Sequence, residues 1–118
     1  MKKIAVIGSR SFNNYELLKD TLDKYQYFYG IDTIISGGAK GADKLAEQYA
    51  KENGVKIRIF KPEWGKYGKK AGIIRNKKIV EEADIVLAFW DGKSKGTEFT
   101  INYANKLGKE MEVIIIYD

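Results

Sequence analysis

The chain has 118 residues and 44% of them are hydrophobic, which is the size and composition of one folded domain with a real core. It contains no cysteine and no histidine. This excludes disulfides, thiolate metal sites and the catalytic pairs that need histidine. We expect no bound metal and no cofactor. The net charge of +5 favours an anionic partner such as a nucleotide, nucleic acid or acidic lipid.

The apolar run near the start of the chain covers only residues 4–7. It is too short for a secretion signal or a membrane span, so we expect a cytoplasmic protein without a membrane partner. No linker, internal repeat or low-complexity tract interrupts the sequence. We therefore expect a single domain over residues 1–118.

Short apolar runs alternate with helical patterns, which is typical of repeated βα units. Strands are predicted at residues 4–7, 32–36, 55–59, 85–90 and 113–116. Apolar residues at helical spacing predict four helices between them, marked by Tyr15, Leu18, Leu22 and Tyr25, by Leu45, Ala46, Tyr49 and Ala50, by Ile73, Ile74, Val80 and Ala83, and by Phe99, Tyr103, Ala104 and Leu107. A loop is expected at residues 61–68.

The run at residues 55–59 alternates apolar with basic residues and is expected at a sheet edge, whereas the run at 85–90 is continuously apolar. Right-handed crossovers then favour a Rossmann-like, doubly wound α/β fold with about five parallel strands in the order 3-2-1-4-5 and helices on both faces. Ligands of such sheets bind beyond the carboxyl ends of the strands where the order reverses, here between the first and fourth strands.

The turn after the first strand carries groups that suit a phosphate. Gly8 permits a tight turn, Ser9 and Ser11 offer hydroxyls, and Arg10 can grip a phosphate through two hydrogen bonds. An ordinary βα turn with a serine cap is the alternative.

The turn after the second strand, residues 36–43, holds three glycines before a helix. Glycines let a backbone approach a ligand closely, and N–H groups at a helix start favour an anion. The spacing is neither that of a Walker A loop nor that of G-x-G-x-x-G. Asp43 falls in the first helical turn, where an acid is favourable in any case.

The turn after the fourth strand, residues 91–98, again opens a helix and carries Lys93, Lys95, Ser94 and Thr97. Its Gly-Lys-Ser resembles the end of a P-loop, but the upstream glycine of that motif falls at Leu87, so we reject an NTPase. Three such turns at one sheet edge predict an anion site.

The segment before the third helix adds aromatic and basic residues, namely Trp64, Tyr67, Lys69, Lys70 and Arg75. Trp64 is either a stacking partner for a base or a packing lid, and Arg75 can reach an anion. Trp90 ends an apolar strand and is expected in the core.

Taken together, these segments resemble the SLOG superfamily, and most closely its small YspA/YpsA-related members, which are common in bacteria and phages. The resemblance covers nearly the whole chain and rests on residues 8–10, 36–43, 62–64, Gly72 with Arg75 and Asn76, and 89–97. It implies the fold predicted above, and a domain that binds nucleotide-derived signals such as ADP-ribose relatives.

Two better-known groups of that superfamily imply different activities. DprA proteins have a similar series of motifs and bind single-stranded DNA. LOG phosphoribohydrolases release a base from a nucleoside monophosphate, with an arginine to which Arg75 corresponds and a glutamate in P-G-G-x-G-T-x-x-E. That glutamate position holds Thr100 here, and the nearest acid is Glu98.

The leading hypothesis is therefore binding of a nucleotide or ADP-ribose-like ligand, as a sensor or a sequestering module. The ligand-binding residues expected are Gly8, Ser9, Arg10, Ser36, Gly37, Gly38, Gly41, Asp43, Trp64, Tyr67, Arg75, Asn76, Asp91, Lys93, Ser94, Gly96, Thr97 and Glu98. A nucleotide N-glycoside hydrolase is the alternative, with Arg75, Glu98 and Asp43 as catalytic residues. Single-stranded nucleic acid binding is a further alternative. The apolar run at 113–116 favours self-association as a homodimer or larger.

Overall fold

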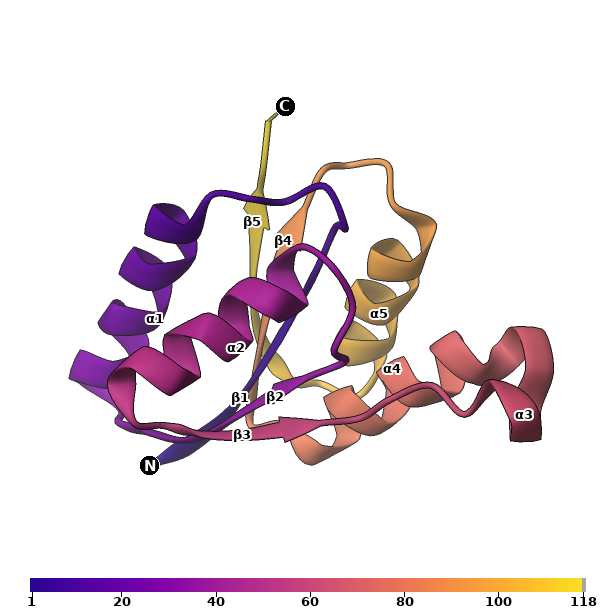
Figure 1. Cartoon of the computed structure of the whole chain (residues 1–118), viewed down its shortest axis with the longest axis horizontal. Helices are drawn as coiled ribbons and strands as arrows, with labels where there is room; N and C mark the ends of the chain where they lie inside the picture. Colours follow the sequence, from indigo (N-terminus) through magenta and orange to yellow (C-terminus); the bar gives the residue numbers. More distant parts are fainter. Residues whose placement is uncertain (118) are drawn as a thin grey trace.

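Five parallel strands form one sheet in the order β3-β2-β1-β4-β5, as predicted (Figure 1). The computed structural model describes residues 1–117. The strands are β1 (Lys2–Gly8), β2 (Ile31–Ser36), β3 (Lys56–Ile59), β4 (Ile85–Trp90) and β5 (Glu110–Ile115). The helices are α1 (Tyr15–Phe28), α2 (Ala42–Asn53), α3 (Trp64–Tyr67), α4 (Ala71–Glu82) and α5 (Lys95–Lys106), with a 3₁₀ turn η1 (Gly68–Lys70) between α3 and α4.

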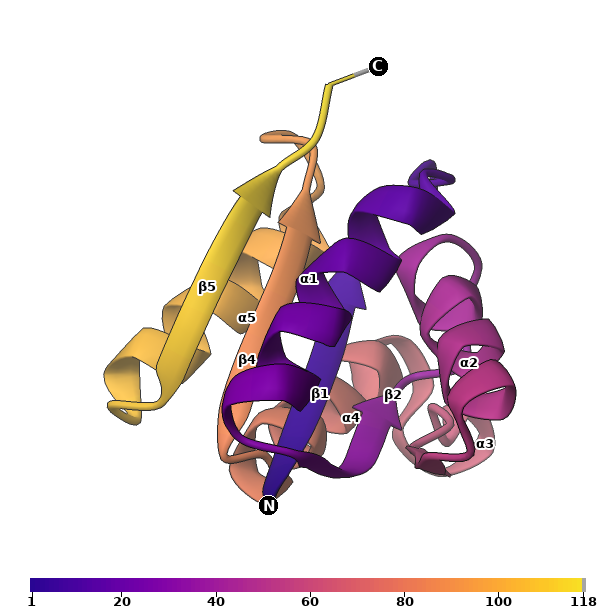
Figure 2. The same ribbon diagram turned by 90° about the vertical axis from the view of Figure 1, so that its left-hand side faces the viewer.

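Helices cover both faces of the sheet (Figure 2). Successive side chains of a strand point to opposite faces, so Ile4 and Val6 of β1 pack with α1 and α2, whereas Ala5 and Ile7 pack with α4 and α5. All four side chains are buried. The expected α/β architecture of doubly wound type is confirmed, and β1 lies at the centre of the sheet between β2 and β4.

Helix boundaries follow local signals in the sequence. The side chain of Asn14 accepts a hydrogen bond from the Leu17 N–H at 3.1 Å and so caps the start of α1. Gly54 ends α2 in the left-handed conformation, with φ of 65° and ψ of 29°.

Two segments differ from the sequence-based prediction. The expected loop at 61–68 contains the short helix α3, which runs through η1 into α4. Strand β5 begins at Glu110 rather than at residue 113, because Glu110 to Ile115 pair in register with Ile85 to Trp90 of β4. Its polar first half escaped the prediction because Glu112 faces the α1 side of an edge strand, where it accepts a hydrogen bond from the Tyr25 hydroxyl at 2.6 Å.

The two edges of the sheet differ. Strand β3 is short and basic, whereas Val113 and Ile115 leave apolar surface on β5. The self-association expected from that edge stays a prediction. Among residues 1–117, no helix combines the length and the apolar character that crossing a bilayer requires.

Candidate functional site

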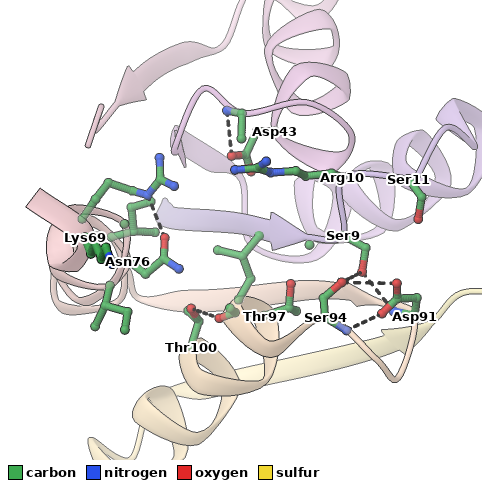
Figure 3. A pocket seen from close by; sticks show the side chains of 18 of the residues that line it. Ser9, Arg10, Ser11, Asp43, Lys69, Asn76, Asp91, Ser94, Thr97 and Thr100 are labelled. Carbon is green, nitrogen blue, oxygen red and sulfur yellow. Dashed lines mark hydrogen bonds between the residues drawn. The ribbon is translucent and has the colours of Figure 1, made fainter. Parts of the chain in front are cut away.

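A cavity of about 580 Å³ lies at the carboxyl ends of β1 and β4, where the strand order reverses (Figure 3). Its walls come from the β1–α1, β2–α2 and β4–α5 turns, and from the segment that runs from α3 into α4. This is the size of the concave sites that hold small ligands and cofactors.

The structure brings many of the expected site residues to this cavity and leaves others outside. The expected residues that line it are Gly8, Ser9, Arg10, Asp43, Trp64, Arg75, Asn76, Asp91, Ser94, Gly96 and Thr97. The expected residues that do not line it are Ser36, Gly37, Gly38, Gly41, Tyr67, Lys93 and Glu98.

Ser11 and Lys69, which the sequence indicates as polar groups of these segments but which are not among the expected ligand-binding residues, also line the cavity. The other lining residues were not expected, namely Ile7, Ala39, Gly72, Ile73, Ile79 and Thr100. Helical spacing was the signal that could have found several of them. Gly72 and Ile79 lie four residues before and three after Asn76, and Thr100 lies three residues after Thr97. Residues at these spacings share one face of a helix.

A polar cluster of Ser9, Asp91 and Ser94 joins the β1 and β4 turns. The Ser9 hydroxyl accepts the Asp91 N–H at 3.1 Å and lies 3.0 Å from the Ser94 hydroxyl. The Asp91 carboxylate accepts the N–H groups of Lys93 and Ser94, each at 2.8 Å. The Ser94 N–H contributes most to lowering the pKa of Asp91 to about 2, and the Lys93 N–H contributes next. These two N–H groups therefore serve the turn itself.

Trp90 completes the same turn. It is only partly buried, packing against the α4 and α5 side of the core, and its indole N–H donates to the Ser94 carbonyl at 3.1 Å. The tryptophan expected in the core thus also holds the start of α5 in place.

The first turn of α5 faces the cavity through Gly96 and Thr97. The first N–H groups of a helix have no partner within it, and the side chain of Ser94, the residue that precedes α5, makes no capping hydrogen bond to them. The helix dipole adds partial positive charge at this end. The start of α5 therefore makes this wall suited to an anion, and the exposed Arg10 adds positive charge to the cavity from the β1–α1 turn.

Arg75 of α4 holds the opposite wall together. One terminal nitrogen donates to the Gly37 carbonyl at 2.6 Å and to the Phe60 carbonyl at 3.4 Å, and its Nε donates to the Asn76 side-chain oxygen at 2.7 Å. Burial lowers the pKa of the Arg75 guanidinium, and the charge of Asp43 opposes that shift. Arg75 thus links α4 to the ends of β2 and β3.

The Arg75 bond also fixes the orientation of the Asn76 amide. A guanidinium Nε–H can only donate, so the oxygen of Asn76 must be the atom that faces it. The amide nitrogen is then left on the cavity side, as Figure 3 shows. Asn76 therefore presents a hydrogen-bond donor to any ligand in the cavity.

Asp43, in the first turn of α2, is a buried carboxylate with 8% of its surface exposed. It accepts the Ala39 N–H at 3.0 Å. Burial raises its pKa to about 6, although the Ala39 N–H and the charge of Arg75 act in the opposite direction, while Glu47 adds to the rise. The cavity thus holds one carboxylate that titrates near neutral pH.

This titration predicts a specific pH dependence of stability. Because the pKa of Asp43 rises from 3.8 to about 6 on folding, the folded state binds its proton more tightly. The stabilisation that Asp43 contributes to the free energy of unfolding is then largest below pH 4 and is lost as the pH rises through about 6. Urea unfolding at pH 4 and pH 7 should show wild type losing about 2 kcal/mol more than Asp43→Asn over this interval. Equal losses in the two proteins would contradict the assignment.

Strand order and the cavity at its switch point place the chain among the Rossmann-like, doubly wound α/β proteins. The family model described as "YspA, cpYpsA-related SLOG family" (YAcAr) matches residues 2–67. The Gene 61 protein of Mycobacterium phage D29 is 33% identical in an alignment of 116 residues that covers 92% of this chain and 92% of the phage protein. The chain belongs to the YspA, cpYpsA-related SLOG family.

Solved structures with the same fold include two DNA processing proteins A (DprA). The protein from Streptococcus pneumoniae superimposes with a TM-score of 0.79 at 21% identity, over 96% of this chain and 50% of its own. The protein from Helicobacter pylori gives a TM-score of 0.73 at 22% identity, over 94% of this chain and 64% of its own. This chain thus spans about half to two thirds of the DprA chains, with which it shares the fold.

Proposed function

We propose that the cavity binds a nucleotide-derived ligand, such as a nucleotide or an ADP-ribose relative. The observation that carries the proposal is the uncapped start of α5, which faces the same cavity as Arg10, Lys69 and the donor amide of Asn76. These groups supply positive charge and N–H donors for phosphate oxygens. The resemblance to the SLOG superfamily implies the same ligand class.

The remaining walls suit the other parts of a nucleotide. Asp43 is an acceptor for sugar hydroxyls, a role that bare phosphate would leave unused. Trp64 is 56% exposed and offers an indole ring on which a base can stack, and Ile73 adds a second apolar side chain to the lining. Phosphate at α5, sugar beside Asp43 and base against Trp64 is therefore the proposed arrangement.

Binding without turnover, as in a sensor or a sequestering module, is favoured over hydrolysis of an N-glycosidic bond. In the LOG enzymes that the sequence resembles, such hydrolysis uses an arginine and a glutamate, and the position of that glutamate holds Thr100 here, which lines the cavity. Among residues 1–117, the acidic residues that line the cavity are Asp43 and Asp91, and the oxygens of Asp91 hold its own turn. Glu98 lies outside and pairs with Lys95 at 4.0 Å. Release of free base from a nucleoside monophosphate, abolished in Glu98→Gln, would overturn this preference.

Gly96→Asp tests the binding site directly. A side chain at Gly96 meets nothing within 4 Å, and an acidic residue near a helix start is favourable, so the variant should fold. The added carboxylate repels a phosphate held by the same helix end. By calorimetry, AMP, NAD, ADP-ribose or a cyclic nucleotide should bind the wild type, and the affinity of that ligand should fall at least tenfold in Gly96→Asp.

Gly96→Ala is the matched control, because it adds a side chain without charge. It should retain an affinity within about threefold of wild type, since an alanine here meets open space. Absence of binding by all of these ligands below millimolar concentration would overturn the proposal. An unchanged affinity in Gly96→Asp would show that the ligand lies elsewhere.

A nucleotide, with its phosphate, sugar and base, is also the repeating unit of a nucleic acid strand. The neighbouring Helicobacter pylori DprA has a single-stranded DNA binding mode. A cavity that holds phosphate, sugar and base can accept the unit free or as part of a strand. The calorimetric screen tests binding of the free ligand. The charge distribution of the chain bears on whether it binds a nucleic acid strand.

A further inference from the structure

The positive charge of the chain is concentrated in one segment, residues 61–78, which we call the basic arm. Its only acid is Glu63, and its bases are Lys61, Lys66, Lys69, Lys70, Arg75, Lys77 and Lys78. The arm therefore carries a net charge of +6, while the whole chain carries +5. The remaining residues are almost neutral in sum, with a net charge of −1.

Most of these charges are not neutralised by the fold. All six lysines of the arm are exposed. Among residues 1–117, only Lys78 of these six has an acidic partner, Glu63 at 3.6 Å. Lys66 lies over the Tyr67 ring at 5.1 Å instead, an arrangement that keeps its charge available. The arm is therefore a source of positive potential for an external polyanion.

The basic arm and the cavity form one continuous surface. Trp64, Lys69 and Ile73 belong to the arm and also line the cavity. Figure 1 shows α3, at the tip of the arm, extending sideways from the body of the molecule. Phosphates on this surface would lie outside the cavity but next to a nucleotide within it.

We infer that the basic arm binds the phosphate backbone of single-stranded nucleic acid whose end nucleotide occupies the cavity. This inference rests on the proposed function, because the cavity supplies the nucleotide site. A charged groove joined to an exposed aromatic side chain is the usual design for single strands. A duplex keeps its bases stacked inside and cannot present one to Trp64. An anionic membrane is disfavoured because the surface next to the lysines is a polar cavity.

The length of the strand provides the test. The probes are 5′-TMP and 5′-phosphorylated oligo(dT) of four and twelve nucleotides, measured by calorimetry and by fluorescence anisotropy at two salt concentrations. The twelve-nucleotide strand should bind at least tenfold more tightly than 5′-TMP, and its affinity should fall steeply with salt. Oligo(rU) of the same length then shows whether the strand is RNA or DNA.

Two matched triple variants separate the effect of the basic arm on binding from the effect of the net charge of the chain. Lys61, Lys66 and Lys70 lie in the arm but outside the cavity lining, and changing all three to glutamine should weaken the twelve-nucleotide strand at least tenfold. The slope of log affinity against log salt should become shallower by about 2, as for loss of three phosphate contacts. Binding of 5′-TMP should stay at the wild-type level. The control changes three lysines outside the arm to glutamine, namely Lys2, Lys51 and Lys106, and so removes the same charge elsewhere. It should change neither the strand affinity nor the salt slope.

The outcomes distinguish this inference from the proposed function. Two results would overturn the role of the basic arm and leave the cavity proposal standing. One is tight binding of 5′-TMP with no gain in affinity for longer strands, and the other is an equal loss of strand affinity in the two triple variants. Strand binding that survives in Gly96→Asp overturns the insertion of an end nucleotide. Binding to vesicles of anionic lipid, without binding to oligonucleotides, assigns the arm to a membrane and overturns the inference.

Discussion

Arg75→Ala is expected to lower the free energy of unfolding by about 3 kcal/mol. The guanidinium joins three segments through the carbonyls of Gly37 and Phe60 and the side-chain oxygen of Asn76. Its removal leaves these acceptors without their charged donor, and leaves buried Asp43 without the positive charge that offsets its burial. Urea unfolding at pH 7 measures the loss. A change below about 1 kcal/mol, the size typical of an ordinary exposed charge, would contradict this role.

A different variant, Arg75→Lys, separates two roles for Arg75 in ligand binding. The sequence predicts direct contact with an anion, whereas the structure makes Arg75 the group that orients Asn76. Arg75→Lys keeps the charge near Asp43 but replaces the Nε–H that faces the Asn76 oxygen. If Arg75 acts through Asn76, adding Arg75→Lys to Asn76→Ala should weaken the ligand no further than Asn76→Ala alone. Additive losses would instead assign direct contact to Arg75.

The fold was predictable because its signals are local and repeated. The apolar runs of β1, β2 and β4 and the helical spacing between them leave few arrangements once crossovers are right-handed. The start of β5 was missed because its first residues are stabilised by pairing with β4 rather than by their own hydrophobicity. Helix α3 was missed for a related reason, since four residues give no periodicity.

The site was predictable only at the level of which turns surround it. The sequence cannot say where an N–H points, and those of Lys93 and Ser94 point to Asp91 rather than to the cavity. Nor can it say what a glycine lies against. An added side chain at Gly37 would come within 2.5 Å of the Arg75 guanidinium, so this glycine makes room for a side chain of the protein itself. The sequence does not distinguish a glycine that makes room for a ligand from one that makes room for an arginine of the protein.

Gly41→Ala is expected to have the largest effect on stability, a loss of about 4 kcal/mol or more. Gly41 precedes α2 with φ of 79° and ψ of −128°, a conformation that side chains rarely adopt. An added Cβ would lie 2.3 Å from the Ser9 carbonyl oxygen and 2.7 Å from that of Arg10. Both are backbone atoms, so the β1–α1 and β2–α2 turns would have to separate.

Gly54→Ala is the control for Gly41→Ala, because Gly54 also has positive φ, of 65°, but an added side chain there meets nothing within 4 Å. It should cost about 1 kcal/mol, the strain of the left-handed conformation alone. The excess in Gly41→Ala then measures the contact between the two turns. Because that contact places Ser9 and Arg10 on the cavity wall, the folded fraction of Gly41→Ala should also bind the ligand more weakly, whereas Gly54→Ala should bind it as wild type does. Equal losses of stability in the two variants would show that the turns are not held together at Gly41.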